Sequence, residues 1–75
     1  MHDTTIHIRT DQGDLCLPHG STLLEAVDQL MAPQGRAPES VATAVNGQFV
    51  ARSLRATHVL HDGDAVLCFA PITGG

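Results

Sequence analysis

The sequence predicts an α+β fold in which one helix packs on a mixed sheet, with the elements in the order ββαβββ. Two observations lead to this prediction. One stretch near the middle has apolar residues at helical spacing, and alternating or apolar segments lie on both sides of it. The last segment, residues 65–70, is apolar at every position, as in a central strand buried on much of both faces. With 75 residues, the chain has room for one domain, which we expect to span residues 1–75.

The first two strands are predicted to form a hairpin. Residues 5–10 alternate, with Ile6 and Ile8 facing one way and their neighbours the other, which indicates a half-buried strand. A turn cluster follows at residues 11–14, and residues 15–17 return as the second strand. This strand ends at Pro18, because proline has no N–H to donate to a ladder.

The helix has a clear beginning and a clear end in the sequence. Thr22 and Glu25 fit a capping box, in which each side chain bonds to the main chain of the other residue. Pro33 and Gly35 stop the helix, and a polar loop follows to residue 40. The residues expected on its buried face are Leu23, Leu24, Val27, Leu30 and Met31.

The second half of the chain supplies three more strands. Residues 41–45 and 48–51 flank Asn46-Gly47, the strongest short hairpin signal. An irregular connection at residues 52–61, anchored by apolar residues, leads to the tight turn 62–64. A last strand that is central must lie beside the first strand, which gives the β-grasp (ubiquitin-like) arrangement. The apolar anchors expected in the connection are Leu54, Val59 and Leu60.

Composition excludes several classes of function. The formal net charge is −4 and the aromatic content is 3%, so we expect no nucleic-acid partner and no anionic membrane surface. A core this small leaves little room for an enclosed substrate pocket, so we do not expect an enzyme. The two cysteines and an N-terminus without a signal-like segment indicate reduced thiols in the cytoplasm.

The tail that follows the last strand, residues 72–75, carries the candidate chemistry. Gly74 and Gly75 have no Cβ, so an extended Gly-Gly end can thread a narrow channel. The α-carboxylate of Gly75 could attack the α-phosphate of ATP, and a sulfur nucleophile could then displace AMP to leave a thiocarboxylate. The chain has no glycine-rich, lysine-containing phosphate loop. A partner enzyme must therefore supply the activation.

Three motifs in order resemble the ThiS family of ubiquitin-like sulfur carriers. They are the strand ending in Asn46-Gly47 with its continuation to Arg52, the turn 62–64, and the terminal Thr73-Gly74-Gly75. The resemblance covers nearly the whole chain. It implies that Gly75 is adenylated by an E1-like enzyme of the ThiF type, with Gly74 as the lead-in.

The resemblance also implies the remaining partners. Sulfur would come from cysteine through a desulfurase, and thiazole synthase of the ThiG type would accept it from the thiocarboxylate in thiamine biosynthesis. No cofactor is expected on the chain itself, because ATP is consumed by the activating enzyme.

Two alternatives stay open at this point. The ending from Phe69 to Gly75 resembles the small subunit of molybdopterin synthase, a MoaD-like sulfur carrier, whereas the connection up to residue 62 and the total length favour ThiS. A β-grasp interaction module whose tail does no chemistry is the other alternative.

Other chemistry-bearing residues have plainer explanations. His58 and His61 form an H-x-x-H pair outside any helix, and no Cys-x-x-Cys is present, so no metal site is expected. Cys16 and Cys68 lie on strands separated by the first strand, about 9–10 Å apart and beyond disulfide reach. Cys68 as a persulfide acceptor is the alternative to a buried small apolar residue.

Surface residues near the last strand complete the candidate site. Phe69 is expected on the open face of the sheet near the tail, where it could form a partner-docking patch with Leu67. Arg52 and Arg55 are expected to be solvated surface residues, and pairing with acidic groups of an activating enzyme is the alternative.

Overall fold

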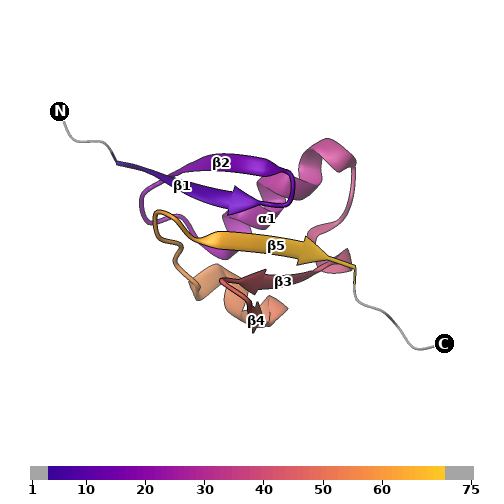
Figure 1. The fold of residues 1–75 in the computed structure, drawn as a ribbon. Coiled ribbons are helices and arrows are strands. Elements are labelled where there is room, and N and C mark those ends of the chain that lie inside the picture. The colour runs from indigo at the N-terminus through magenta and orange to yellow at the C-terminus, as the bar shows by residue number, and fades with distance from the viewer. Residues whose placement is uncertain (1–3, 71–75) are drawn as a thin grey trace.

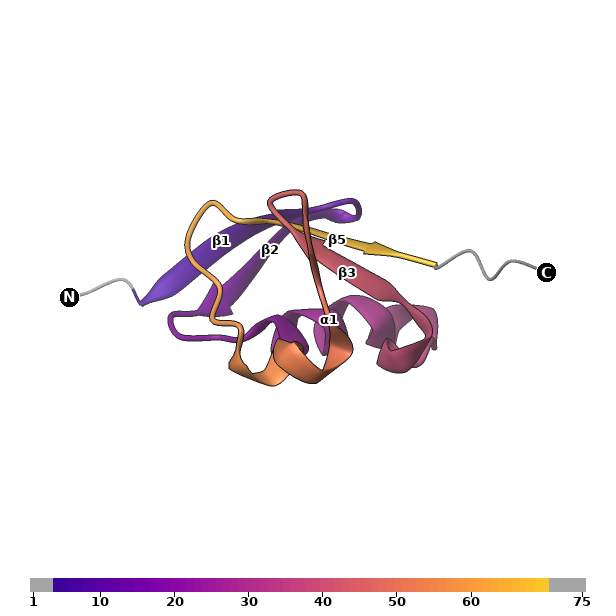
Figure 2. The ribbon, with the colours of Figure 1, turned by 90° about the horizontal axis from the view of Figure 1, so that it is seen from below.

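A five-stranded mixed sheet with one helix lying across one of its faces forms the framework of the molecule (Figures 1 and 2). The computed structural model describes residues 4–70. The strand order is β2-β1-β5-β3-β4, and the fold class predicted from the sequence is confirmed. The strands are β1 (Thr5–Thr10), β2 (Gly13–Pro18), β3 (Ala42–Val45), β4 (Gln48–Val50) and β5 (Ala65–Phe69).

The N-terminal hairpin forms as predicted, with a longer second strand. β1 and β2 pair antiparallel from Thr5 opposite Pro18 to Thr10 opposite Gly13, so the turn contains only residues 11 and 12. Pro18 is the last residue of β2, as its missing N–H requires. Ile6 and Ile8 point into the core.

Helix α1 (Leu23–Met31) begins with the predicted capping box. Thr22 N donates to Glu25 Oε1 at 2.9 Å, and Glu25 N donates to Thr22 Oγ1 at 3.5 Å. After Met31 the chain tightens into a short 3₁₀ helix (Ala32–Gln34), and Gly35 ends it in the left-handed conformation with φ 65°.

One predicted member of the buried helix face is wrong. Leu24 is 38% exposed, and Ala26 takes its place in the core. The sheet covers α1 from one side only, so residues about 100° away from that side reach solvent. The core holds Ile6, Ile8, Leu17, Leu23, Ala26, Val27, Leu30, Met31, Val41, Val45, Val50, Leu60, Val66 and Cys68.

β3 and β4 form the second hairpin through the predicted turn. Asn46 and Gly47 have φ values of 52° and 84°, the two positive values that a type I′ turn requires. Val45 pairs with Gln48 directly across this turn.

The C-terminal strand lies in the centre of the sheet, as predicted. β5 runs parallel to β1, with Arg9 opposite Ala65, and antiparallel to β3, with Ala42 opposite Phe69. The expectation that β5 is buried on both faces is wrong, because the single helix covers only one of them. Val66 and Cys68 face the helix and are buried, whereas Leu67 and Phe69 are exposed.

The connection between β4 and β5 is more regular than its sequence indicates. A 3₁₀ helix (Arg52–Thr57) packs against α1, as seen from below in Figure 2. Of the three expected apolar anchors, only Leu60 is buried, and Leu54 and Val59 are 56% and 46% exposed. Arg55 is the buried residue of the 3₁₀ helix itself, which the sequence did not predict.

Candidate functional site

The predicted reacting residues Thr73, Gly74 and Gly75 lie outside the described residues, whereas the strand that leads to them is described. β5 pairs with β1 at its beginning and with β3 through to Phe69. The last described residue is Ala70. The chain therefore reaches its predicted site from a central strand that is held by main-chain hydrogen bonds on both sides near its start.

An apolar patch covers the open face of the sheet beside the end of β5. Leu67 and Phe69 are 46% and 41% exposed, which confirms that Phe69 faces away from the helix. Phe49, on the edge strand β4, is 67% exposed. The register places Ala44 between Phe49 and Leu67, and Ala42 opposite Phe69. We call these five residues the open-face patch.

Sequence reasoning missed Phe49 as a member of this patch. The strand after the Asn46-Gly47 turn could have indicated it, because side chains alternate along a strand and an inward Val50 places Phe49 on the outer face. Exposed aromatic and aliphatic side chains that gather on one face are typical of protein–protein contact sites. The docking role of Phe69 and Leu67 stays a prediction.

A shallow hollow of about 340 Å³ adjoins this patch. Its lining includes the small residues Ala44 and Ala65, and Arg9 and Asp11 contribute polar groups. The hollow has room for one apolar side chain of a partner, and Arg9 and Asp11 lie at its lining as polar contacts.

The Asn46-Gly47 turn and the 62–64 turn meet in the structure. Asn46 Nδ2 donates to Asp64 Oδ1 at 3.0 Å, and Ala65 N donates to Asn46 Oδ1 at 3.0 Å. Asp64 Oδ2 accepts from His61 N at 2.9 Å. The two motifs therefore occur together for a structural reason, because they fix the start of β5 against the end of β3.

The neighbouring carboxylate, Asp62, anchors the same turn to β1. Its Oδ1 accepts from His7 N at 2.8 Å and lies 3.5 Å from His7 Nδ1. Gly63 N donates to His7 O at 2.7 Å. The carboxylates of Asp62 and Asp64 thus accept the hydrogen bonds that hold the 62–64 turn against β1 and β3.

Acidification should weaken the turn through Asp64. Burial acts to raise the pKa of Asp64, but hydrogen bonds from Asn46 and His61 outweigh it and hold the pKa below its usual value. The stability that Asp64 contributes is complete above the unfolded pKa of about 3.9 and is lost as the pH falls through the lower folded-state pKa. Asp64→Asn should cost about 1–2 kcal/mol at pH 7.

This cost should shrink in acid, where the wild-type side chain is also neutral. Urea unfolding followed by circular dichroism at a series of pH values measures both proteins. A gap between wild type and variant that stays constant from neutral pH to acid would contradict the role of the carboxylate.

Arg55 departs most from its prediction. The residue is only 2% exposed, whereas Arg52 is exposed as expected. The guanidinium donates from Nε to Thr43 Oγ1 at 3.2 Å, from Nη1 to Pro38 O at 3.0 Å and from Nη2 to Val41 O at 2.6 Å. Thr43 Oγ1 in turn donates to Val50 O.

Two features of the structure bear on the position of Arg55. The 3₁₀ helix has three residues per turn, so Arg52 and Arg55 lie on the same side of it. Thr43 is fully buried between Val41 and Val45 on the inward face of β3, and a buried hydroxyl needs a partner. That inward-facing Thr43 was the available sequence signal for Arg55.

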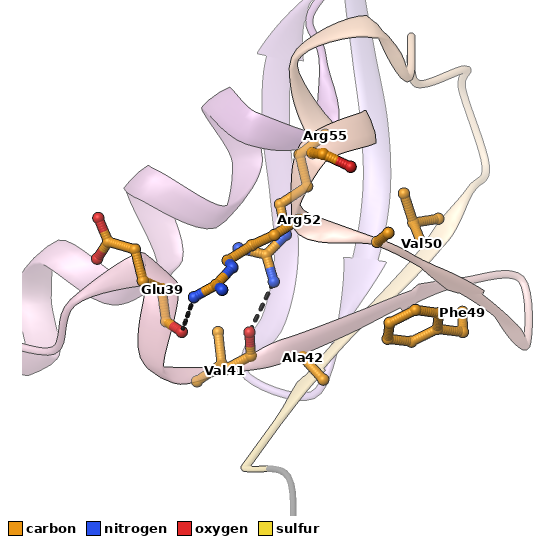
Figure 3. Close-up of a pocket in the computed structure, with 9 residues that line it drawn as sticks. Glu39, Val41, Ala42, Phe49, Val50, Arg52 and Arg55 are labelled. Atoms are coloured by element: carbon orange, nitrogen blue, oxygen red, sulfur yellow. Dashed lines mark hydrogen bonds between the residues drawn. The ribbon is translucent and has the colours of Figure 1, made fainter.

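Arg52 and Arg55 line a hollow of about 540 Å³ at the β3–β4 edge (Figure 3). Phe49 and Ala42 of the open-face patch also line it. Arg52 Nη1 donates to Glu39 O at 3.0 Å, while Figure 3 shows the Glu39 carboxylate directed away from Arg52. Two cationic side chains thus reach the 38–41 segment from one short helix.

The cysteines and histidines show no such clustering. Cys16 is exposed and Cys68 is buried, and burial raises the pKa of the Cys68 thiol, which disfavours its reactive thiolate form. Within residues 4–70 there is no group of three His, Cys, Asp or Glu side chains that could hold a metal ion. In the same part of the chain, no helix is long and apolar enough to cross a membrane.

Comparison with known proteins identifies the family. The ThiS family model matches residues 8–75. The chain is 40% identical over 65 residues to the sulfur carrier protein ThiS of Escherichia coli (strain K12), covering 87% of this chain and 91% of that protein.

Solved structures show the same fold. The crystal structure of the thiamine biosynthesis protein ThiS from Geobacter metallireducens has a TM-score of 0.73 at 21% identity, covering 93% of this chain and all of that one. The ubiquitin of Caldiarchaeum subterraneum has a TM-score of 0.59 at 18% identity, covering 96% of this chain and 98% of that one. Because the family model matches almost the whole sequence, this chain belongs to the ThiS family.

Proposed function

We propose that the chain is a sulfur carrier that bears sulfur as a thiocarboxylate on Gly75 and delivers it for thiazole formation in thiamine biosynthesis. The observation that carries this proposal is the extent of the family match, which runs through Thr73, Gly74 and Gly75 to the last residue. The E. coli relative is named a sulfur carrier, and the Geobacter structure is named a thiamine biosynthesis protein. Both names support the thiazole pathway over the molybdopterin alternative.

The proposed chemistry has two steps. A carboxylate oxygen of Gly75 attacks the α-phosphate of ATP, so that an acyl-adenylate forms and pyrophosphate leaves. A sulfur nucleophile, in the simplest case hydrosulfide, then attacks the acyl carbon and displaces AMP. The products are the thiocarboxylate, AMP and one proton.

In this proposal the chain is a protein co-substrate and not an enzyme. The ATP site and the groups that stabilise charge belong to an adenylating enzyme of the ThiF type. A cysteine desulfurase supplies the sulfur, and thiazole synthase of the ThiG type accepts it. We place these reactions in the cytoplasm, where Cys16 and Cys68 stay reduced.

Reconstitution tests this proposal. The chain is incubated with a ThiF-type enzyme, ATP and sulfide, and its intact mass is measured alongside a known ThiS carrier. The expected change is the replacement of one oxygen by one sulfur, and it depends on ATP. An unchanged mass under conditions that convert the known carrier would contradict the proposal.

The open-face patch is the proposed contact with the adenylating enzyme. Phe69→Ala should raise the KM for adenylation about tenfold with little effect on kcat, because the side chain contributes binding and not chemistry. Pyrophosphate release measures both constants. Leu54→Ala is a matched control, since Leu54 is 56% exposed but lies on the 3₁₀ helix outside the patch. A folded Phe69→Ala protein that is adenylated with wild-type constants would remove this contact.

A further inference from the structure

The arginine hollow at the β3–β4 edge holds two cationic side chains, and neither of them hydrogen-bonds to a carboxylate, although Glu39 also lines the hollow. Arg55 is buried, and its three acceptors are neutral oxygens of Pro38, Val41 and Thr43. Arg52 makes one hydrogen bond, to a main-chain carbonyl. Among residues 4–70, the contact within 4.0 Å between a basic and an acidic side chain is that of His7 on β1 with Asp62 in the turn before β5, and it does not involve Arg52 or Arg55.

The placement of these two cations is unusual for this chain. It carries four Lys or Arg residues against eight Asp or Glu, and two of its arginines meet in one hollow. The pKa of Arg55 is lowered first by burial and also by the charge of Arg52, while Cys68 and Glu39 act in the opposite direction without reversing it. A carboxylate bound in the hollow would relieve both effects, because an opposite charge favours the protonated guanidinium.

The hollow is also continuous with the proposed docking surface. Ala42 and Phe49 line it and belong to the open-face patch, and Ala42 pairs directly with Phe69 in the sheet. Figure 3 shows Ala42 and Phe49 in the same hollow as the two arginines, so an enzyme that contacts the open-face patch would lie next to the mouth of the hollow.

We propose that Arg52, supported by the buried charge of Arg55, receives an Asp or Glu carboxylate of the adenylating enzyme when the carrier docks. This inference rests on the proposed function and names the chemistry of the partner at that contact. Arg52 suits the role because its bond to Glu39 O already holds the side chain over the hollow, which reduces the ordering cost on binding. A guanidinium can also bind a carboxylate through two parallel hydrogen bonds.

The test is a steady-state adenylation assay that varies the carrier concentration. Arg52→Gln should raise the KM about tenfold and leave kcat unchanged, because an interfacial ion pair contributes to docking. Arg52→Lys should give a smaller increase, since lysine keeps the charge but loses the planar fork. The KM of the wild type should rise with salt, and that of Arg52→Gln should rise less.

Arg36→Gln is the matched control. Arg36 is exposed, does not line the hollow, and its loss changes the net charge by the same amount. Thermal unfolding by circular dichroism checks that both variants fold. Equal KM values for Arg52→Gln and Arg36→Gln, with an active wild type, would overturn this inference and leave the sulfur-carrier proposal standing. A wild type that is not adenylated at all would overturn both.

Discussion

Deletion of Gly75 should abolish thiocarboxylate formation and leave the fold intact. The deletion moves the terminal carboxylate back by one residue, about 3.5 Å. Reacting atoms must approach to about 3–3.5 Å, and a misplacement of 1 Å can cost a hundredfold in rate. The fold should persist because the deleted residue lies beyond β5, which ends at Phe69. Intact mass after reaction with the adenylating enzyme, ATP and sulfide measures the loss.

Gly75→Ala is the control of matched length. It keeps the carboxylate in place and adds one methyl group, so it should react more slowly than wild type but faster than the deletion. A deletion variant that is converted at the wild-type rate would show that the tail does no chemistry. That result would favour the alternative of a β-grasp interaction module.

Arg55→Ala should cost about 3–5 kcal/mol of stability, because it leaves buried acceptors without a donor and opens a cavity. The change removes the donor to Pro38 O, Val41 O and Thr43 Oγ1 and leaves a cavity beneath them. A domain of this size is stable by roughly 4–11 kcal/mol. The loss would therefore be a large part of the total.

Urea unfolding followed by circular dichroism measures this loss, since the chain has no Trp or Tyr to report by fluorescence. Arg52→Ala is the matched control and should change stability by less than about 1 kcal/mol, because it is exposed and makes one hydrogen bond. Arg55→Met combined with Thr43→Val should recover part of the loss by removing a polar group together with its partner. An Arg55→Ala protein as stable as Arg52→Ala would contradict a stabilising role for the three hydrogen bonds of Arg55.

Elements whose signals are local could be predicted from the sequence. The capping box at Thr22, the Asn46-Gly47 turn and the stop at Pro33 and Gly35 each depend on a few adjacent residues, and each forms as expected. These features needed no knowledge of the rest of the fold. β5 is central as predicted, although the burial on both faces from which its position was inferred is wrong.

Features that depend on tertiary contacts could not be predicted in the same way. Arg55 is buried because carbonyl groups of the distant 38–41 segment accept its hydrogen bonds, and the inward-facing Thr43 indicates a buried polar partner without identifying which residue it is. Leu24, Leu54 and Val59 are apolar but exposed, because one small helix and one sheet cannot cover every apolar residue. The exposed outer face of β5 has the same cause.

The candidate site also has one part that the sequence predicts and one part that only the structure shows. The reacting carboxylate of Gly75 came from the sequence and its family resemblance, and it lies outside the described residues. The surface beside the end of β5 came from the structure, which joins Phe49, Ala42 and the arginine hollow to the predicted pair Leu67 and Phe69.

Fragmentation mass spectrometry of the reacted chain tests the central claim most directly, because it locates the sulfur on a particular residue. Our account predicts that one oxygen of the Gly75 carboxylate is replaced by sulfur and that Cys16 and Cys68 are unchanged. Sulfur found as an additional atom on either cysteine, with Gly75 unmodified, would contradict it.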